Sequence, residues 1–136
     1  MPNYVIEIPA VLESLRIAAL FTDAVLKGLP DMEGRDKLIH DLALVSSEAL
    51  TNAIRHGEYA GRPVRLSYSI DSQTIVITVT DHGSGFDPEA VALPDFEESP
   101  QGGYGIYIIK SIMDYMRYER TADGNNLILT KCRAAP

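Results

Sequence analysis

The apolar residues of this chain follow one spacing before residue 63 and another after it. From about Val11 to Lys27 and from about Arg35 to His56 they recur every three or four residues, which predicts two amphipathic helices. The stretches "PVRLSYSI" (63–70) and "TIVITVT" (74–80) are instead alternating or β-branched, which predicts two strands joined as a hairpin by "DSQ". A chain with both patterns has to pack helix faces against a sheet.

Shorter elements complete the predicted order. Tyr4–Ile8 is typical of a strand that ends at Pro9, and residues 106–116, "IYIIKSIMDYM", predict a third helix. Residues 117–121 and 126–131 predict two more strands, joined by a turn of the Asn/Gly type. We therefore expect an α+β fold, a two-layer α/β sandwich in which three helices cover one face of a mixed, mostly antiparallel sheet.

Length and charge narrow the classes of function. The chain has 136 residues, which suits one domain with one core, so we expect a single domain over residues 1–136. The net charge of −7 argues against direct nucleic-acid binding, which needs clustered Lys and Arg. We find no apolar run of membrane-spanning length and no signal-peptide pattern. The single Cys132 excludes an internal disulfide. A cytoplasmic protein is the simplest interpretation.

The second predicted helix ends in "SEALTNAIRHG" (47–57), where Glu48 and Asn52 lie one turn apart at the edge of an apolar stripe. A carboxylate can orient or deprotonate a hydroxyl group or a water molecule. An amide oxygen suits Mg²⁺, which prefers oxygen ligands and shares them with phosphates. For this pair alone, a hydrogen bond on a half-exposed helix face is the simpler interpretation.

Two glycine clusters follow. In "TVTDHGSGFD", Asp81 closes a β-rich run and is followed by Gly83 and Gly85. Glycine permits unusual backbone angles and close ligand approach, and an Asp at a strand end can accept a hydrogen bond from an exocyclic amine such as that of adenine. The alternative is an Asx-type turn that ends the strand.

The second cluster, "QGGYGIYIIK", precedes the third predicted helix. Backbone N–H groups at a helix N-terminus form an anion site. The cluster is not a Walker A loop, because no Gly-Lys-Ser/Thr follows, and its spacing does not fit a Rossmann fingerprint. Each cluster alone is a weak signal. The three features together are a far more specific signal than any one of them. They are, in chain order, an acid/amide helix, an Asp-x-Gly-x-Gly strand end and a Gly-x-Gly helix start.

The three motifs resemble those of the GHKL, or Bergerat-fold, ATP-binding superfamily of gyrase, the heat-shock chaperone, histidine kinases and mismatch-repair ATPases. "EALTNAIRHG" is similar to its N box, "DHGSGFD" to its first glycine box and "GGYGIYIIKSIMD" to its second. The chain most resembles a small stand-alone branch, the anti-sigma factor serine/threonine protein kinases. The resemblance extends from Tyr4 to Lys131.

The resemblance implies a role for each matching position. Glu48 would be the general base that polarises a serine hydroxyl of a partner protein, and Asn52 would ligate the Mg²⁺ that bridges the ATP phosphates. Arg16 falls where members of this branch carry an arginine that contacts the partner, although an exposed helix arginine is an equally good interpretation.

The resemblance also implies a nucleotide site. Asp81 would bind the adenine amino group, Gly83 belongs to the same box, and Gly85 would let adenine approach the backbone. Residues 86–101 would form the ATP lid. The phosphates would be cradled by the second box, at Gly103, Tyr104, Gly105 and Ile106.

The sequence departs from this branch at two points. Its kinases often carry a basic residue just ahead of the second glycine box, whereas this chain reads "EESPQGG" with Gln101 and no Arg or Lys. Phosphoryl transfer depends on neutralising charge on the transferred group, so the departure bears on catalysis more than on ATP binding. The branch also often has Gly-Thr before the last strand, where this chain has Gly124 and Asn125; Asn125 can also form a hydrogen bond.

The leading hypothesis is an ATP- and Mg²⁺-dependent serine/threonine kinase in a bacterial partner-switching circuit. Its partners would be a sigma factor and a STAS-type anti-sigma factor antagonist, which it would phosphorylate. The alternative is a non-catalytic ATP-binding module that regulates a partner by sequestering it. A third interpretation, the catalytic domain of a sensor histidine kinase, needs a dimerising histidine helix that this chain lacks. The short first strand could pair across a homodimer.

Overall fold

The computed structural model describes residues 3–57, 61–85 and 104–133, which form a sheet and three helices. The elements in chain order are β1 (Asn3–Ile8), α1 (Ser14–Leu26), α2 (Arg35–Gly57), β2 (Val64–Ile70), β3 (Thr74–Asp81), α3 (Tyr104–Ile112), β4 (Tyr115–Thr121) and β5 (Gly124–Cys132). The predicted order of elements is confirmed.

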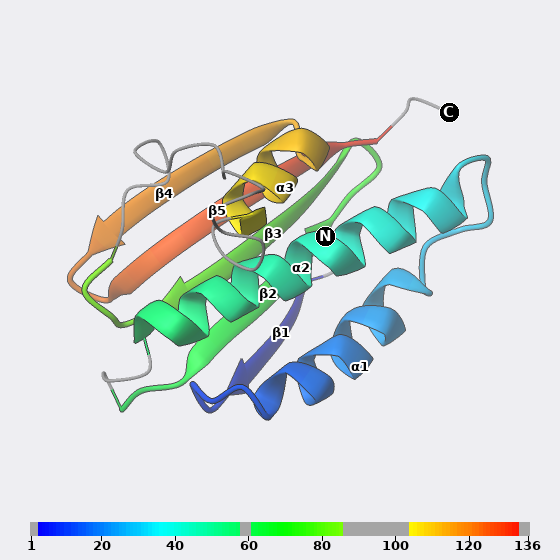
Figure 1. Ribbon diagram of the computed structural model, residues 1–136. Coiled ribbons are helices and arrows are strands. Elements are labelled where there is room, and N and C mark those ends of the chain that lie inside the picture. The colour runs from blue at the N-terminus through cyan, green and yellow to red at the C-terminus, as the bar shows by residue number, and fades with distance from the viewer. Residues whose placement is uncertain (1–2, 58–60, 86–103, 134–136) are drawn as a thin grey trace, which may run out of the picture.

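The three helices lie on one face of a five-stranded sheet (Figure 1). The strand order is β1-β2-β3-β5-β4, so β1 and β4 are the edges and β3 is central. The expected two-layer sandwich is confirmed. All four strand pairs between the described strands are antiparallel, so no parallel pair is found where a mixed sheet was expected. None of the described helices combines the length and the apolar character needed to cross a bilayer.

Strand β3 shows how the pleat of the sheet places a site residue. Its burial alternates along the whole strand, and the buried positions are Ile75, Ile77, Val79 and Asp81. Successive side chains point to opposite faces of a sheet, so Asp81 shares the helix-covered face with three core residues. The strand thus carries a carboxylate to the end of the core.

The third helix is shorter than its hydrophobic pattern predicts. It ends at Ile112, and Tyr115 and Met116, which we expected in the helix, belong to β4. Pairing with β5 explains the difference, because Tyr115 lies opposite Thr130 and the backbone N–H of Asp114 already donates to the Thr130 carbonyl at 3.0 Å. Sheet pairing therefore overrides a helical pattern in these residues.

The first helix also begins later than expected, at Ser14 instead of about Val11. The residues before it form turns, in which the N–H of Val11 donates to Pro9 at 2.8 Å and that of Ser14 donates to Val11 at 3.0 Å. In a helix starting at Val11, the Val11 carbonyl would accept from the N–H of Leu15, but here it accepts from Ser14.

A buried polar contact joins α2 to α1 and to the sheet. The Tyr68 hydroxyl on β2 lies 3.0 Å from Thr22 Oγ1 on α1 and also contacts Ser46 on α2. Burial of the phenol raises the pKa of Tyr68 above its ordinary value, against the smaller opposing effect of these hydrogen bonds. The neutral hydroxyl therefore joins three elements at one point, and α2 is the element that carries Glu48 and Asn52.

Candidate active site

Helices α2 and α3 meet at Glu48 and Gly105. A Cβ atom added to Gly105 would lie 2.9 Å from Glu48 Oε2, closer than side-chain atoms normally approach. The absence of a side chain at Gly105 therefore lets the first turn of α3 lie against the Glu48 carboxylate. The sequence predicted a phosphate role for Gly105 but not this contact with Glu48.

The first turn of α3 offers backbone N–H groups that have no partner within the helix. Tyr104 and Gly105 are the first residues of the helix. The side chain of Ile106 is buried in the core, so this residue could contact a ligand only through its backbone. Such a turn favours negative charge. Gly103 and the predicted lid, residues 86–101, lie outside the described residues.

Asn52 lies one turn after Glu48 on α2 and is partly buried. Its Nδ2 atom is shielded from solvent and has no hydrogen-bond partner in the part of the chain that the structure describes. An unsatisfied buried amide costs about 1–3 kcal/mol, so this residue is not explained by stability. Its amide oxygen fits the ligand set of Mg²⁺.

A metal at Asn52 would need further oxygen ligands. Among the described residues, no group of three or more His, Cys, Asp and Glu side chains could hold a metal ion. Mg²⁺ is commonly bound by one or two side chains together with substrate phosphates and water. A single amide oxygen from the protein, completed by phosphates and water, would fit that arrangement.

Hydrogen bonds join Asp81 to Gly83 and Asn125, and we call these three residues the Asp81 corner. Asp81 is 3 % exposed, and its Oδ1 accepts from the backbone N–H of Gly83 at 2.9 Å and from Asn125 Nδ2 at 3.0 Å. Asn125 Nδ2 also donates to the Gly83 carbonyl at 2.9 Å. The bond from Gly83 is the Asx-type turn that was the alternative interpretation. In the described structure Asp81 Oδ2 accepts no hydrogen bond, so the carboxylate can still bind an amine.

Strand pairing explains the position of Asn125 beside Asp81. Antiparallel pairing places Asp81 opposite Asn125 across β3 and β5. The side-chain amide then reaches both Asp81 and Gly83. The bond to Asp81 depends on a strand register that no local pattern contains, and a hydrogen bond from Asn125 to a nucleotide stays a prediction.

The space beside Gly85 is occupied by Arg120, which the sequence did not indicate. Gly85 has a φ of +84°, and an added Cβ would lie 2.7 Å from Arg120 Nε. Arg120 Nη2 also donates to the Ser84 carbonyl at 2.6 Å. The backbone angle favours glycine here, whereas the exposed Arg120 side chain could shift to admit a Cβ atom. Close approach of adenine to Gly85 stays a prediction.

Gly124 supports the Asp81 corner from the turn between β4 and β5. Its φ is +136°, and an added Cβ would lie 2.9 Å from the Asp81 backbone oxygen, which cannot move without disturbing the sheet. We expect Gly124→Ala to lower the free energy of unfolding by about 2–4 kcal/mol, measured by chemical denaturation.

Gly61→Ala is the matched control for this variant. Gly61 has a φ of +65°, but nothing lies within 4 Å of an added Cβ. Only backbone strain of about 1 kcal/mol is expected there. Equal losses in both variants would show that the contact with Asp81 does not matter.

Arg16 lies apart from the residues around Glu48 and Asp81. It is exposed on α1, which packs on one side of α2, whereas α3 packs against the other side (Figure 1). The structure therefore brings Glu48 and Gly105 together, and separately Asp81, Gly83 and Asn125, and leaves Arg16 on a different surface.

Residues 8–131 match the family model of the histidine kinase-like ATPase domain. The chain belongs to this family. Membership of the histidine kinase-like ATPases implies the use of ATP and confirms the family resemblance of the three motifs.

Three relatives of this histidine kinase-like ATPase domain are similar over most of its length. The serine-protein kinase RsbW of Oceanobacillus iheyensis is 30% identical over 84% of this chain and 78% of that protein. The anti-sigma F factor of Pasteuria penetrans is 39% identical over 60% of this chain and 59% of that protein. The serine/threonine-protein kinase BtrW of Bordetella bronchiseptica is 26% identical over 69% and 70%.

Proposed function

We propose that this chain is an ATP-dependent serine/threonine protein kinase of the anti-sigma type. It binds a sigma factor and phosphorylates an anti-sigma factor antagonist on serine. The contact between Glu48 and the start of α3 carries the proposal, because it sets a carboxylate beside the helix end that would bind phosphates. The names of the relatives, serine-protein kinase and anti-sigma F factor, support the same class.

Each site residue has a role in this proposal. Glu48 accepts the proton of the attacking serine hydroxyl, or orients that hydroxyl, next to the terminal phosphate. Asp81 accepts a hydrogen bond from the adenine amino group through its unused Oδ2, and the backbone at Tyr104–Ile106 holds the phosphates.

Asn52 would hold Mg²⁺ through its amide oxygen. Bound Mg²⁺ supplies charge neutralisation for the phosphates during transfer. The orphaned Nδ2 of Asn52 supports this role, because a residue that destabilises the folded protein is more readily explained by function.

The exposed side of α1 is the proposed surface for partner proteins. Three large apolar side chains are more than half exposed beside Arg16: Leu12 at 55%, Ile17 at 57% and Leu20 at 67%. Exposed apolar groups next to an arginine are typical of protein interfaces. We include a cytoplasmic location in the proposal, since a sigma factor is the expected partner.

The edge strand β1 supports a homodimer. Among the described strands it pairs with β2 alone, and its other side could pair with a strand of a second copy.

The absence of a basic residue in "EESPQGG" favours a second candidate, an ATP-binding module that sequesters a partner without phosphorylating it. Without that charge, binding of ATP could persist while transfer is slow.

Incubation with radiolabelled ATP, Mg²⁺ and a STAS-type antagonist separates the two candidates. The kinase proposal expects phosphoserine on the antagonist. Tight binding of ATP with no transfer under any condition would replace it with the sequestration module.

A further inference from the structure

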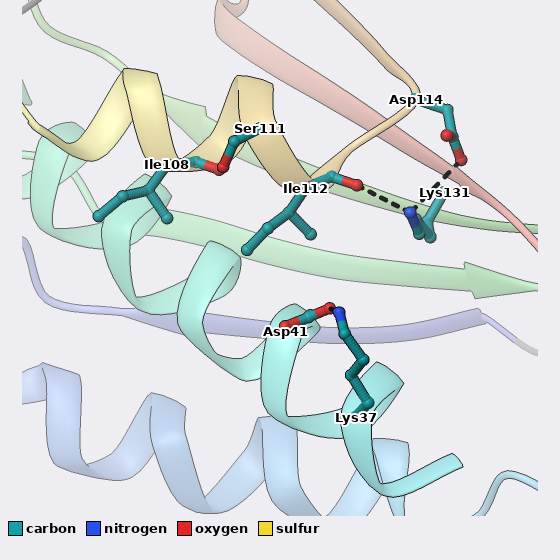
Figure 2. A network of polar contacts seen from close by, with 7 residues as sticks. All are labelled: Lys37, Asp41, Ile108, Ser111, Ile112, Asp114 and Lys131. Atoms are coloured by element: carbon teal, nitrogen blue, oxygen red, sulfur yellow. Dashed lines mark hydrogen bonds and ion pairs between the residues drawn. The ribbon is translucent and has the colours of Figure 1, made fainter. Parts of the chain in front are cut away.

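The C-terminal end of α3 is held to the sheet by Lys131 of β5 (Figure 2). Lys131 Nζ donates to the carbonyl of Ile112, the last residue of α3, at 2.8 Å. The same Nζ lies 3.9 Å from Asp114 Oδ2, and that oxygen accepts from the backbone N–H of Cys132 at 2.6 Å. Lysine and aspartate thus join the helix end, the short link to β4 and the end of β5.

This attachment matters because α3 has only nine residues. A helix of that length is not stable alone, so its position depends on its contacts. Its buried residues Ile106 and Ile109 face the core, and its main packing partner is α2. The bond from Lys131 is a polar link from α3 to the sheet, and a cation is favoured at a helix C-terminus.

The two ends of α3 have different contacts. Gly105 at the start lies against Glu48, and Ile112 at the end is bound by Lys131. A nine-residue helix is about 13 Å long and moves as a rigid unit. A change at Ile112 therefore tilts the first turn relative to Glu48.

The Asp81 corner is remote from Lys131. Asn125 and Lys131 are six residues apart on β5, which corresponds to about 20 Å along the strand. A substitution of Lys131 should therefore alter the position of the first turn of α3, the proposed phosphate site. It should leave the Asp81 corner, the proposed adenine site, unchanged.

We propose that Lys131 is a positioning residue for the phosphate-binding end of α3, and that Asp114 orients Lys131. This inference rests on the proposed function, because it takes the first turn of α3 as the phosphate site. Lys131 touches no ligand. It acts by fixing the angle at which α3 presents its N–H groups beside Glu48.

Lys131→Met tests this proposal, because it keeps the aliphatic stem and removes the donor and the charge. We expect calorimetric titration to show about tenfold weaker binding of ATP, with the affinity for adenosine within about twofold of wild type. If the variant merely lost stability, the binding of ATP and the binding of adenosine would weaken equally. That result would overturn the proposal. Lys131→Arg retains a cationic donor and should restore ATP binding.

Lys37→Met is the matched control. Lys37 forms a similar pair with Asp41 at 2.6 Å, but both residues of this pair belong to α2 (Figure 2). Its removal should change neither affinity, and a tenfold loss of ATP binding in this variant would contradict the assignment to Lys131.

Hydrogen exchange separates this inference from the proposed function. In nucleotide-free protein, Lys131→Met should speed amide exchange across α3 and leave α2 unchanged. Unchanged exchange in α3 would refute the positioning role alone. Failure of the wild-type protein to bind ATP would overturn the proposed function and the phosphate role together.

Discussion

Glu48→Gln is expected to lower the rate of phosphoryl transfer to an antagonist by about 10²- to 10⁴-fold, the usual contribution of a positioned general base. The amide has the shape of the carboxylate, so the contact with Gly105 is kept and α3 should not move. Affinity for ATP should therefore remain within about threefold of wild type, since a loss confined to the rate indicates an interaction made in the transition state. Single-turnover transfer from radiolabelled ATP measures the rate, and equilibrium titration measures the affinity.

Asp36→Asn is a suitable control for this experiment. It removes a carboxylate from the exposed first turn of the same helix, where the side chain is fully accessible. Transfer by this variant should equal that of wild type. If Glu48→Gln transfers as fast as Asp36→Asn, Glu48 is not the base.

Asn52→Ala is expected to abolish the contribution of Mg²⁺ to ATP binding. In wild type, ATP should bind at least about tenfold more tightly with Mg²⁺ than with a chelator present, because Asn52 would hold the metal and the metal would neutralise phosphate charge. Without the amide oxygen the two affinities should converge. The comparison uses titrations of each protein with and without the metal.

The same variant distinguishes a ligand-binding role from a structural one. Asn52 Nδ2 is buried and has no partner among the described residues, so its removal should leave the thermal midpoint unchanged or raise it. Thr51→Ala, which removes an exposed hydroxyl bonded to the Ser47 carbonyl on the same helix, should leave the Mg²⁺ effect intact. A persistent Mg²⁺ effect in Asn52→Ala would refute the metal assignment.

Much of the fold could be predicted because it depends on local spacing. The period of the apolar residues gave the order of the elements and, within a few residues, the bounds of α2, β2 and β3. The predicted end of the third helix was wrong because a partner elsewhere in the chain decides it. Residues 115 and 116 fit a helical pattern, but β5 pairs with them and makes them part of β4.

In the candidate site too, some features follow from local sequence and others from partners elsewhere in the chain. The motifs identified Glu48, Asn52 and Asp81 because the residue types and their order carry that information. The motifs did not contain Arg120 beside Gly85 or Lys131 beneath α3. Both lie on strands with an ordinary alternating pattern. The pairing of β4 with β5 and of β5 with β3 places Arg120 beside Gly85 and Lys131 at the end of α3.

The sequence by itself thus determined which chemical groups are present and on which kind of element each one lies. Helical and strand periods are set by neighbouring residues, so they can be read locally. Only the tertiary structure decided that Gly105 lies against Glu48 and that Asn125 bonds to Asp81. Those contacts join residues more than forty positions apart, and they follow from strand register and helix packing, which depend on the whole core at once.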